Sequence, residues 1–511
     1  MSKTIIIIGA GLAGLSAALQ AAENGCNVKL VSSLPSERAQ SVMAEGGINA
    51  ALNTKDENDS PEEHFTDTIK AACGLADPNA VWGMTQAAPE LVHWLLKLGV
   101  KFNMSGYDDV DLRNFGGQKK KRTAFAQSDT GKQIMTAMID AVRRKEASGM
   151  VERFSHHSFL TLRLCGNICC GCVIRDEYSQ ETVELPGDAV IVATGGMHGL
   201  FGNTTGSLSN TGEVTAELFR LGVPLANGEM IQYHPTTVKC GGKRMLISEA
   251  ARGEGGRLFA MKDGKQWYFM EEKYPELGNL MPRDITAREI WKVSHESEVF
   301  LDMTEISEEI ISNKLSGLAD DCMTYLHKDI RKEPVSVLPG IHYFMGGILV
   351  DEQHRTPIQN LCAAGECCAQ YHGANRLGGN SLLGALYGGR VAAKSACEQA
   401  DAVDLSCATQ IDFPPASQIS EIKQLNKVMQ ETMGVVRNEN TLLNGIQTVQ
   451  ALTGNLPLLG MAVLKSALAR KESRGAHWRE DYPKSNDDDY LKTTVARFDG
   501  CLLYTSDAAD E

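Results

Sequence analysis

Three glycines near the start of the chain stand at a spacing that can hold a pyrophosphate. Gly9, Gly11 and Gly14 are the fixed positions of a GxGxxG pattern. Gly9 permits a tight turn, and Gly11 lets the backbone approach a phosphate group. Gly14 lets a helix pack closely against the preceding strand, and the N–H groups at the start of that helix face the anion. This chemistry is that of a dinucleotide-binding turn.

The elements predicted around the turn are the ones that this chemistry requires. Residues 4–8 form a short β-branched apolar run, which is typical of a strand buried on both faces. A helix is predicted over residues 15–23, Gly25 ends it, and a second strand is predicted over residues 27–31. In this βαβ context GxGxxG predicts dinucleotide binding. Ser32 replaces the acidic residue that usually binds the ribose, so the turn alone does not separate FAD from NAD.

Three further segments carry glycine where a predicted strand ends or soon after one. Strands are predicted over residues 190–193 and 361–364, and each runs into a glycine. Glu366 follows the second of these strands, where it can accept hydrogen bonds from ribose hydroxyls. One such glycine is common in loops, but their recurrence indicates an extended nucleotide site. The segments are Ala44-Glu45-Gly46-Gly47, Thr194-Gly195-Gly196 and Gly365-Glu366.

A long helix is predicted downstream of these segments, over residues 382–399, with Asn380 or Ser381 as its N-cap. The partial positive charge at a helix N-terminus stabilises an anion nearby. We therefore expect this N-terminus to face the edge of a flavin ring that carries negative charge in the reduced state.

Six longer motifs give the chain a specific resemblance. From about residue 3 to about residue 498 it is similar to the flavoprotein subunit of fumarate reductase and succinate dehydrogenase. The resemblance implies an FAD-dependent oxidoreductase that reduces fumarate to succinate, in a reversible reaction. The motifs are AEGG at 44–47, QYHPT at 232–236, EAARGEGG at 249–256, PRD at 282–284, HYFMGG at 342–347 and HGANRLGGNSL at 372–382.

The fold that this resemblance implies is of the α/β class. A Rossmann-like FAD-binding domain of the glutathione reductase type is expected in two segments, 1–225 and 341–400. An inserted α+β capping domain is expected over 226–340, and a helical C-terminal domain over 410–498. Residues 499–511 do not continue the similarity, and we expect them to be a truncated or artefactual terminus.

The resemblance also implies how FAD is held. Membrane-bound members of the family usually attach FAD to a histidine just before AEGG, and Gln40 stands at that position. Because a carboxamide cannot form the histidyl bond, we expect FAD to be bound non-covalently. Without the covalent bond, we expect fumarate reduction to be favoured over succinate oxidation. The residues expected to bind FAD are Gly9, Ala10, Gly11, Leu12, Ala13, Gly14, Ser32, Ser41, Glu45, Gly46, Gly47, Ala193, Thr194, Gly195, Glu213, Glu366, Arg376, Asn380, Ser381 and Leu382.

Fumarate reduction requires cationic or donor partners for two carboxylates in a dry pocket. By resemblance these partners are His234, His342 and Arg376. Ser248 stands where the family usually has threonine, and its hydroxyl can make the same contact. Phe115 matches the aromatic residue that packs over the substrate.

An acid must protonate the carbon next to the one that receives the hydride. The family match gives this role to Arg283, although an arginine has an ordinary pKa of about 12.5 or above. Glu249 and Arg252 are expected to return the proton to Arg283. Their i, i+3 spacing would place both on one face of a helix.

Two other functions remain open on the sequence. L-aspartate oxidase is a soluble relative with non-covalent FAD, and it has a glutamate where this chain has Phe115. Since a phenylalanine offers no partner for the ammonium group of aspartate, the sequence favours an unsubstituted C4 dicarboxylate. A non-catalytic electron-transfer or assembly subunit that keeps FAD is the second alternative.

Composition and charge argue against several other classes. No run approaches the ~20 apolar residues of a membrane-spanning helix. The net charge of −14 argues against a general nucleic-acid binder, and we interpret the basic run 119–122 as a solvated loop end. The densest cysteine group fits a hairpin over residues 159–174 better than an iron–sulfur pattern, so no metal site is predicted. This group is Cys165, Cys169, Cys170 and Cys172.

Electrons must reach the flavin from another protein, because no run in the chain resembles an iron–sulfur or quinone site. The resemblance implies an iron–sulfur partner subunit and a membrane anchor beyond it. The N-terminus has no export-signal pattern. We therefore expect a cytoplasmic protein, and two arrangements stay open: a soluble electron donor, or peripheral attachment to the inner face of the membrane through partner subunits.

Overall fold

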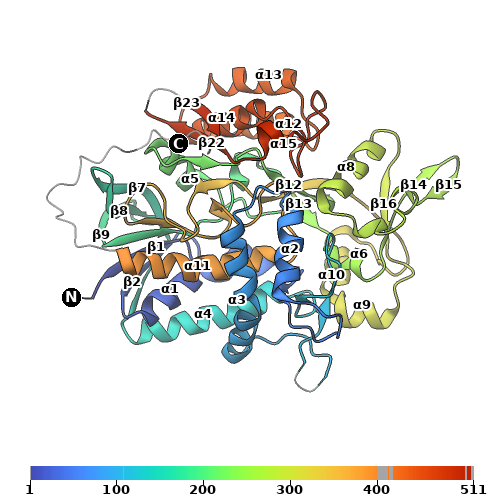
Figure 1. Cartoon of the computed structure of the whole chain (residues 1–511), viewed down its shortest axis with the longest axis horizontal. Coiled ribbons are helices and arrows are strands. Elements are labelled where there is room, and N and C mark those ends of the chain that lie inside the picture. Colours follow the sequence, from blue (N-terminus) through green and yellow to red (C-terminus); the bar gives the residue numbers. More distant parts are fainter. Residues whose placement is uncertain (1, 107–108, 400–412, 414–417, 501–502, 508–511) are drawn as a thin grey trace.

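A five-stranded parallel sheet lies at the centre of the N-terminal domain (Figure 1). The computed structural model describes residues 2–106, 109–399, 413, 418–500 and 503–507. One edge strand of the sheet, β20, comes from far downstream, so two distant segments of the chain build this domain. In spatial order the strands are β20 (Leu361–Ala363), β10 (Ala189–Val192), β1 (Thr4–Ile8), β2 (Asn27–Ser32) and β6 (Val151–Ser155).

Strand β1 is buried on both faces because its alternate side chains enter two different apolar clusters. Ile5 and Ile7 pack with helical residues on one face, whereas Ile6 and Ile8 pack against an antiparallel sheet on the other. This three-layer order confirms the predicted α/β fold of the glutathione reductase type. The helices are α1 (Leu12–Glu23), α3 (Pro78–Leu98), α4 (Thr130–Ala147) and α11 (Asn380–Gln399), and the sheet is β7 (His157–Cys165), β8 (Ile168–Asp176) and β9 (Thr182–Pro186).

Helix α1 begins at Leu12, three residues before the predicted start. The second half of the GxGxxG pattern is therefore already helical, and Gly14 lies inside α1. A Cβ on Gly14 would fall 1.8 Å from the carbonyl oxygen of Gly9, so the absent side chain lets helix and turn touch. The conformational freedom of Gly9 is needed too, because its φ is +111°.

The hairpin predicted over residues 159–174 is confirmed by β7 and β8, with its turn at Gly166-Asn167. Cys169 and Cys172 are buried in the cluster that contains Ile6, where they act as small apolar side chains. Within the described ranges, no three His, Cys, Asp or Glu side chains are grouped so that they could hold a metal ion.

The segment between β10 and β20 adds a second lobe with its own apolar core, seen at the right of Figure 1. Leu258, Ile290 and Leu301 are fully buried in that core. The predicted boundaries 226 and 340 remain predictions. The strands of this lobe and its stem are β12 (Ile231–Cys240), β13 (Lys243–Leu246), β14 (Arg257–Lys262), β15 (Lys265–Trp267), β16 (Val299–Asp302), β17 (Val335–Ser336) and β18 (Leu338–Phe344), and its helices are α6 (Glu249–Gly253), α7 (Phe269–Lys273), α8 (Arg283–Ser294), α9 (Glu308–Lys314) and α10 (Ser316–Asp321).

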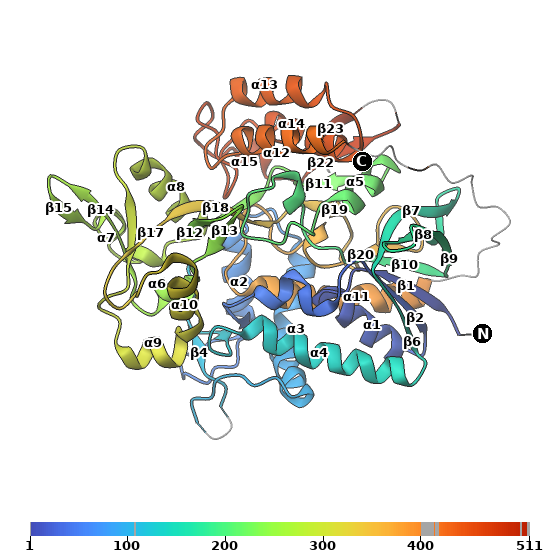
Figure 2. The ribbon, with the colours of Figure 1, turned by 180° about the vertical axis from the view of Figure 1, so that it is seen from behind.

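The C-terminal part is helical and lies along the top edge of the molecule in Figures 1 and 2. Its strand β22 (Thr494–Phe498) pairs with β11 (Leu225–Ala226) of the N-terminal domain. The predicted end of the FAD-binding domain, residue 400, and the predicted start of the C-terminal domain, residue 410, lie outside the described residues. Its elements are α12 (Ile419–Thr432), α13 (Glu439–Val449), α14 (Asn455–Ala469), α15 (Asp487–Tyr490) and β23 (Leu503–Asp507).

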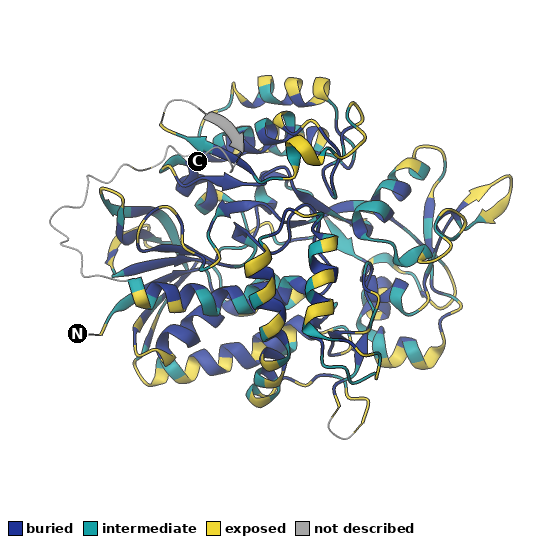
Figure 3. Cartoon of the chain, in the orientation of Figure 1, coloured by how far each residue is buried: buried dark blue, intermediate teal, exposed yellow. Residues whose placement is uncertain are grey.

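The remaining short elements connect these layers. The strands of the central sheet are coloured mainly as buried in Figure 3. Across the described ranges, no helix has the length and apolar character needed to cross a membrane. The connecting elements are α2 (Pro61–Ala71), α5 (Glu213–Arg220), β3 (Ile48–Asn49), β4 (Leu112–Arg113), β5 (Thr123–Ala124), β19 (Gly347–Leu349) and β21 (Cys368–Ala369).

The basic run 119–122 is only in part the solvated loop end that we predicted: Lys119 and Lys121 are exposed, but Arg122 is not. Arg122 is fully buried, and its Nη2 lies 2.8 Å from Asp59 Oδ1 and 2.9 Å from Asp67 Oδ2. Lys120 pairs with Glu63 at 3.0 Å. A buried guanidinium requires such partners, which come from a segment some 60 residues earlier.

The close contact of α1 with the glycine turn gives a test of the fold. We expect Gly14→Ala to destabilise the protein by about 3 kcal/mol or more, because the new methyl group would overlap the Gly9 carbonyl. Gly242→Ala is the matched control, since a Cβ there meets no atom within 4 Å. The measurement is the midpoint of thermal unfolding. Equal midpoints for the two variants would contradict this account of the turn.

Candidate active site

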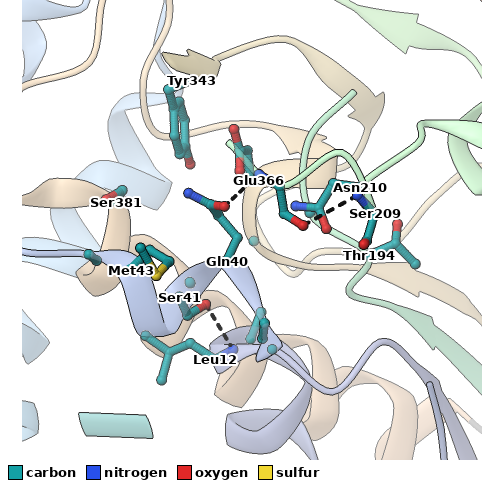
Figure 4. A pocket seen from close by; sticks show the side chains of 18 of the residues that line it. Leu12, Gln40, Ser41, Met43, Thr194, Ser209, Asn210, Tyr343, Glu366 and Ser381 are labelled. Atoms are coloured by element: carbon teal, nitrogen blue, oxygen red, sulfur yellow. Dashed lines mark hydrogen bonds between the residues drawn. The ribbon is translucent and has the colours of Figure 1, made fainter. Parts of the chain in front are cut away.

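A cavity of about 560 Å³ runs from the glycine turn to the stem of the inserted lobe. Gln40, Tyr343 and Glu366 point toward one another across it (Figure 4). The structure brings most of the predicted site residues into its wall. Those that line it are Gly9, Ala10, Gly11, Leu12, Ala13, Ser32, Ser41, Glu45, Gly46, Gly47, Phe115, Ala193, Thr194, Gly195, Glu213, His234, Ser248, Glu249, Arg283, His342, Glu366, Arg376, Ser381 and Leu382.

Three predicted residues lie outside this wall. Gly14 packs inside α1, and Arg252 lies behind Glu249, where its Nη1 donates to the carbonyl of Asn279 at 2.6 Å. Asn380 is fully buried, and its Nδ2 donates to Thr68 Oγ1 at 3.0 Å. Its Oδ1 accepts from Asn49 Nδ2 at 2.7 Å, so the side-chain amide is bonded within the protein at the start of α11.

Several lining residues were not predicted from the sequence. The loop 205–212 contributes one side of the cavity, and the backbone N–H of Ser207 donates to Gln40 Oε1 at 2.6 Å. Arg244 and Tyr343 also line the cavity. Tyr343 follows His342 in the HYFMGG motif, but only His342 was predicted from that motif to bind the substrate. The loop contains no recognised motif, so its sequence did not predict that it would line the cavity.

The wall near the glycine turn fits the phosphate and ribose groups of FAD. The turn approaches β10 so closely that a Cβ on Gly9 would lie 2.2 Å from the carbonyl oxygen of Ala193. Ser32 Oγ, at the end of β2, is buried and has no hydrogen-bond partner among the described residues. A buried hydroxyl without a partner is costly, so it indicates a polar ligand at this point.

Glu249 lies at the centre of the opposite end of the cavity. Its Oε2 accepts from Arg283 Nε at 2.8 Å and from Arg283 Nη2 at 2.5 Å. Its Oε1 accepts from Arg252 Nη2 at 3.2 Å and from the backbone N–H of Gly116 at 3.1 Å. Glu249 and Arg252 share the short helix α6, as their spacing predicted. One carboxylate thus joins two arginines.

The charge of this carboxylate is maintained by its partners. Burial would raise the pKa of Glu249, but the guanidinium groups of Arg283 and Arg252 hold that pKa below its ordinary value. Glu249 is therefore ionised near neutral pH. Since a buried carboxylate without partners is strongly destabilising, Arg283 and Arg252 are held in fixed positions by the same contacts.

The predicted carboxylate-binding residues converge beside Arg283. The rings of His234 and His342 lie 5.1 Å apart in an edge-on arrangement. His342 Nδ1 lies 2.8 Å from Thr205 Oγ1, which orients the ring. The guanidinium of Arg376 lies 4.3 Å from the centre of the Tyr343 ring. Two neutral donors and two cations can therefore meet an anion from several sides.

The charge on these groups is set by burial. Burial and the nearby Arg283 lower the pKa of both His234 and His342 well below the ordinary value, so both imidazoles are neutral. Burial and Arg283 also lower the pKa of Arg376, to about 9, which leaves it charged at neutral pH. The positive charge of the site is therefore confined to arginines.

Phe115 and Ser248 complete the wall at this end. The Phe115 ring is buried and packs so tightly on two glycines that a Cβ on Gly46 or Gly378 would lie 2.7 or 3.0 Å from it. Ser248 caps α6, where its Oγ accepts from the N–H of Ala250 at 3.4 Å. Burial, with Asp321 nearby, raises the pKa of Glu45 to about 8.

Comparison with known proteins agrees with this geometry. A model of FAD-binding domains matches residues 4–382, and a model of the fumarate reductase flavoprotein C-terminus matches residues 453–504. The succinate dehydrogenase flavoprotein subunit of Bacillus subtilis is 39% identical, over 97% of this chain and 94% of that protein. This chain belongs to the fumarate reductase and succinate dehydrogenase flavoprotein family. It is a flavoprotein oxidoreductase.

Two further relatives show the breadth of the similarity. The structure of a mutant FrdA of E. coli quinol fumarate reductase superposes with a TM-score of 0.90 at 27% identity, covering 99% of this chain and 96% of that one. An L-aspartate oxidase of Pyrococcus furiosus is 32% identical, over 98% of this chain and all of that protein. The fold and the use of FAD follow from the family, whereas the substrate depends on the site.

The buried histidines predict how stability depends on pH. Burial lowers the pKa of His64 to about 3 and that of His354 to about 4, and it lowers the pKa of four further histidines. Below about pH 6.5 the unfolded chain binds protons on these groups and the native protein does not. Stability therefore falls as the pH falls. Four carboxylates contribute in the opposite direction, because burial raises their pKa values, but they are fewer than the six histidines; they are Glu45, Asp59, Glu213 and Asp321.

We expect the midpoint of thermal unfolding to decrease between pH 7.5 and pH 5.5, with each such histidine contributing up to about 1.4 kcal/mol per pH unit. His354→Gln should make the decrease smaller, because one titrating group is removed. A midpoint that rises on acidification would contradict the assignment of neutral buried imidazoles.

Proposed function

We propose that this protein reduces fumarate to succinate, using FAD that is bound without a covalent bond. The observation that carries the proposal is the cavity itself. It begins at the dinucleotide turn and ends among two neutral histidines and two buried arginines. An anion with two carboxylates matches that arrangement of donors and positive charge. FAD, when bound, supplies the hydride that one alkene carbon receives.

In this proposal the substrate carboxylates bind His234, His342 and Arg376, with Ser248 as a further donor. Phe115 covers the substrate and excludes water, which strengthens these contacts in a low-dielectric site. Holding one carboxylate out of the plane of the alkene makes the double bond electrophilic. The neutral state of both histidines supports this role, since each can donate one N–H without adding charge.

The proton for the second carbon comes from Arg283 in this proposal. Arg283 lines the cavity and bonds Glu249, which in turn bonds Arg252. The chain of contacts supports a proton path from Arg252 through Glu249 to Arg283. In this proposal Arg283 acts as the acid because it lies at the cavity wall and a relay within the site returns its proton.

The same geometry argues against the two alternatives. L-aspartate carries an ammonium group, and Phe115 offers it no negative charge, while Glu249 is already paired with two arginines. A non-catalytic subunit would not need the ion pair of Arg283 and Glu249 at the cavity wall. We propose further that an iron–sulfur subunit delivers the electrons, and that a membrane anchor holds the complex at the cytoplasmic face.

Substitution of Arg283 tests the proton donor. We expect Arg283→Ala to lower the rate of fumarate reduction at least about 100-fold, as is typical for loss of a general acid, while FAD stays bound. Arg283→Lys should restore little of the activity, because an ammonium group cannot make the same set of hydrogen bonds as a guanidinium. Lys292→Ala, on the exposed face of the same helix, is the matched control. Fumarate turnover within threefold of wild type in Arg283→Ala would contradict the role.

The state of FAD is tested by acid precipitation. Gln40 stands where a histidyl bond would form, and its Oε1 is occupied by the N–H of Ser207. We expect all flavin absorbance in the supernatant after precipitation with trichloroacetic acid. A yellow pellet, or a fluorescent band on a denaturing gel, would show a covalent bond and contradict the proposal.

A further inference from the structure

The side chain of Gln232 lies between two arginines of the cavity wall. Its Oε1 accepts a hydrogen bond from Arg283 Nη1 at 3.0 Å and another from Arg376 Nη2 at 3.0 Å. Gln232 is fully buried, and it belongs to the QYHPT motif, of which His234 alone has been given a role. One neutral oxygen therefore holds two cationic side chains from different parts of the chain.

The orientation of this amide is fixed from the other side. Gln232 Nε2 donates to Asn375 Oδ1 at 3.0 Å and to the carbonyl oxygen of Arg376 at 2.8 Å. These acceptors can bond only the NH₂ end of the amide, so its oxygen must face the guanidinium groups. Asn375 Nδ2 is in turn held by Asp284 Oδ1 at 3.2 Å. The amide cannot turn over without losing all four bonds.

The backbone of β12 also aims this side chain. The pairing of β12 with β18 is irregular between Gln232 and Tyr233, and again between His234 and Thr237. Such irregularities redirect side chains and occur close to functional sites. Pro235, which cannot donate to a ladder, lies within the second irregularity. The strand thus presents Gln232 and His234 to one site from a short distorted segment.

Two buried like charges need a shared acceptor. Burial lowers the pKa of Arg376, and the charge of Arg283 lowers it further, because the two guanidinium groups repel each other. Arg283 has a second tether in Glu249, whereas Arg376 otherwise rests on the face of the Tyr343 ring. An amide oxygen attracts both cations through its dipole and leaves their net charge in place. A carboxylate at this position would cancel the charge that a dianionic substrate requires.

We propose that Gln232 is a positioning residue, which aligns Arg283 and Arg376 toward one dicarboxylate while preserving the positive charge of both. The inference rests on the proposed function, because it assigns these two arginines to substrate binding and protonation. Gln232 does not line the cavity, so it acts through the arginines and not by touching the substrate.

The test compares Gln232→Leu and Gln232→Glu with wild type, all loaded with FAD. We expect Gln232→Leu to lower kcat for fumarate at least tenfold with a smaller change in KM, since the proton donor loses alignment. We expect Gln232→Glu to raise KM, and the Kd for succinate measured by calorimetry, at least tenfold, since a carboxylate pairs with both arginines. Gln370→Leu is the matched control, a buried glutamine whose Nε2 donates to the carbonyl of Asp351.

The outcomes separate this inference from the proposed function. Wild type without fumarate turnover would refute the proposed function. Wild-type turnover with both Gln232 variants within threefold of Gln370→Leu would overturn the role of Gln232. If both Gln232 variants lose FAD and thermal stability, and kcat and KM change together in each, Gln232 has a structural role. This outcome would overturn the proposed positioning role as well. Gln232→Asn, which keeps an amide on a shorter chain, replaces Gln232→Leu if that variant does not fold.

Discussion

The buried carboxylate of Glu249 is the constraint on which the rest of the site depends. It is ionised in the protein interior, so it requires charged partners, and it finds them in Arg252 of the same helix and Arg283 of α8. The N–H of Gly116 adds a contact from the N-terminal segment of the chain. One side chain thereby joins the inserted lobe to the FAD-binding domain at the cavity.

The electrostatic character of the cavity follows from this pairing. Glu249 offsets part of the charge of Arg283 and Arg252, while burial keeps His234 and His342 neutral. Arg376 remains charged and is tethered by a neutral oxygen. This end of the cavity is therefore cationic, and the repulsion between its two arginines is moderated by Glu249 and by the Gln232 oxygen, which suits a small dianion. The dinucleotide end offers glycines and the backbone N–H groups at the start of α1.

Much of the fold was predictable, because strong local patterns coincide with the observed elements. The apolar run 4–8 is β1, and the helix predicted over 382–399 is the greater part of α11. The start of α1 was predicted late, because a glycine-rich turn hides a helix whose first residues pack by close contact. Arg122 was misjudged because the partners that bury it, Asp59 and Asp67, are distant in sequence. The position of Gln232 between two arginines was not predicted for the same reason, because the sequence of a single strand does not show which distant residues contact it.

The most direct test of the account is a comparison of substrates with the purified, FAD-loaded protein. Reduced viologen serves as the donor for fumarate, a dye as the acceptor for succinate, and L-aspartate is supplied in parallel. We expect fumarate to oxidise the viologen faster than succinate reduces the dye, and L-aspartate not to be consumed. Turnover of L-aspartate without turnover of fumarate would contradict this expectation.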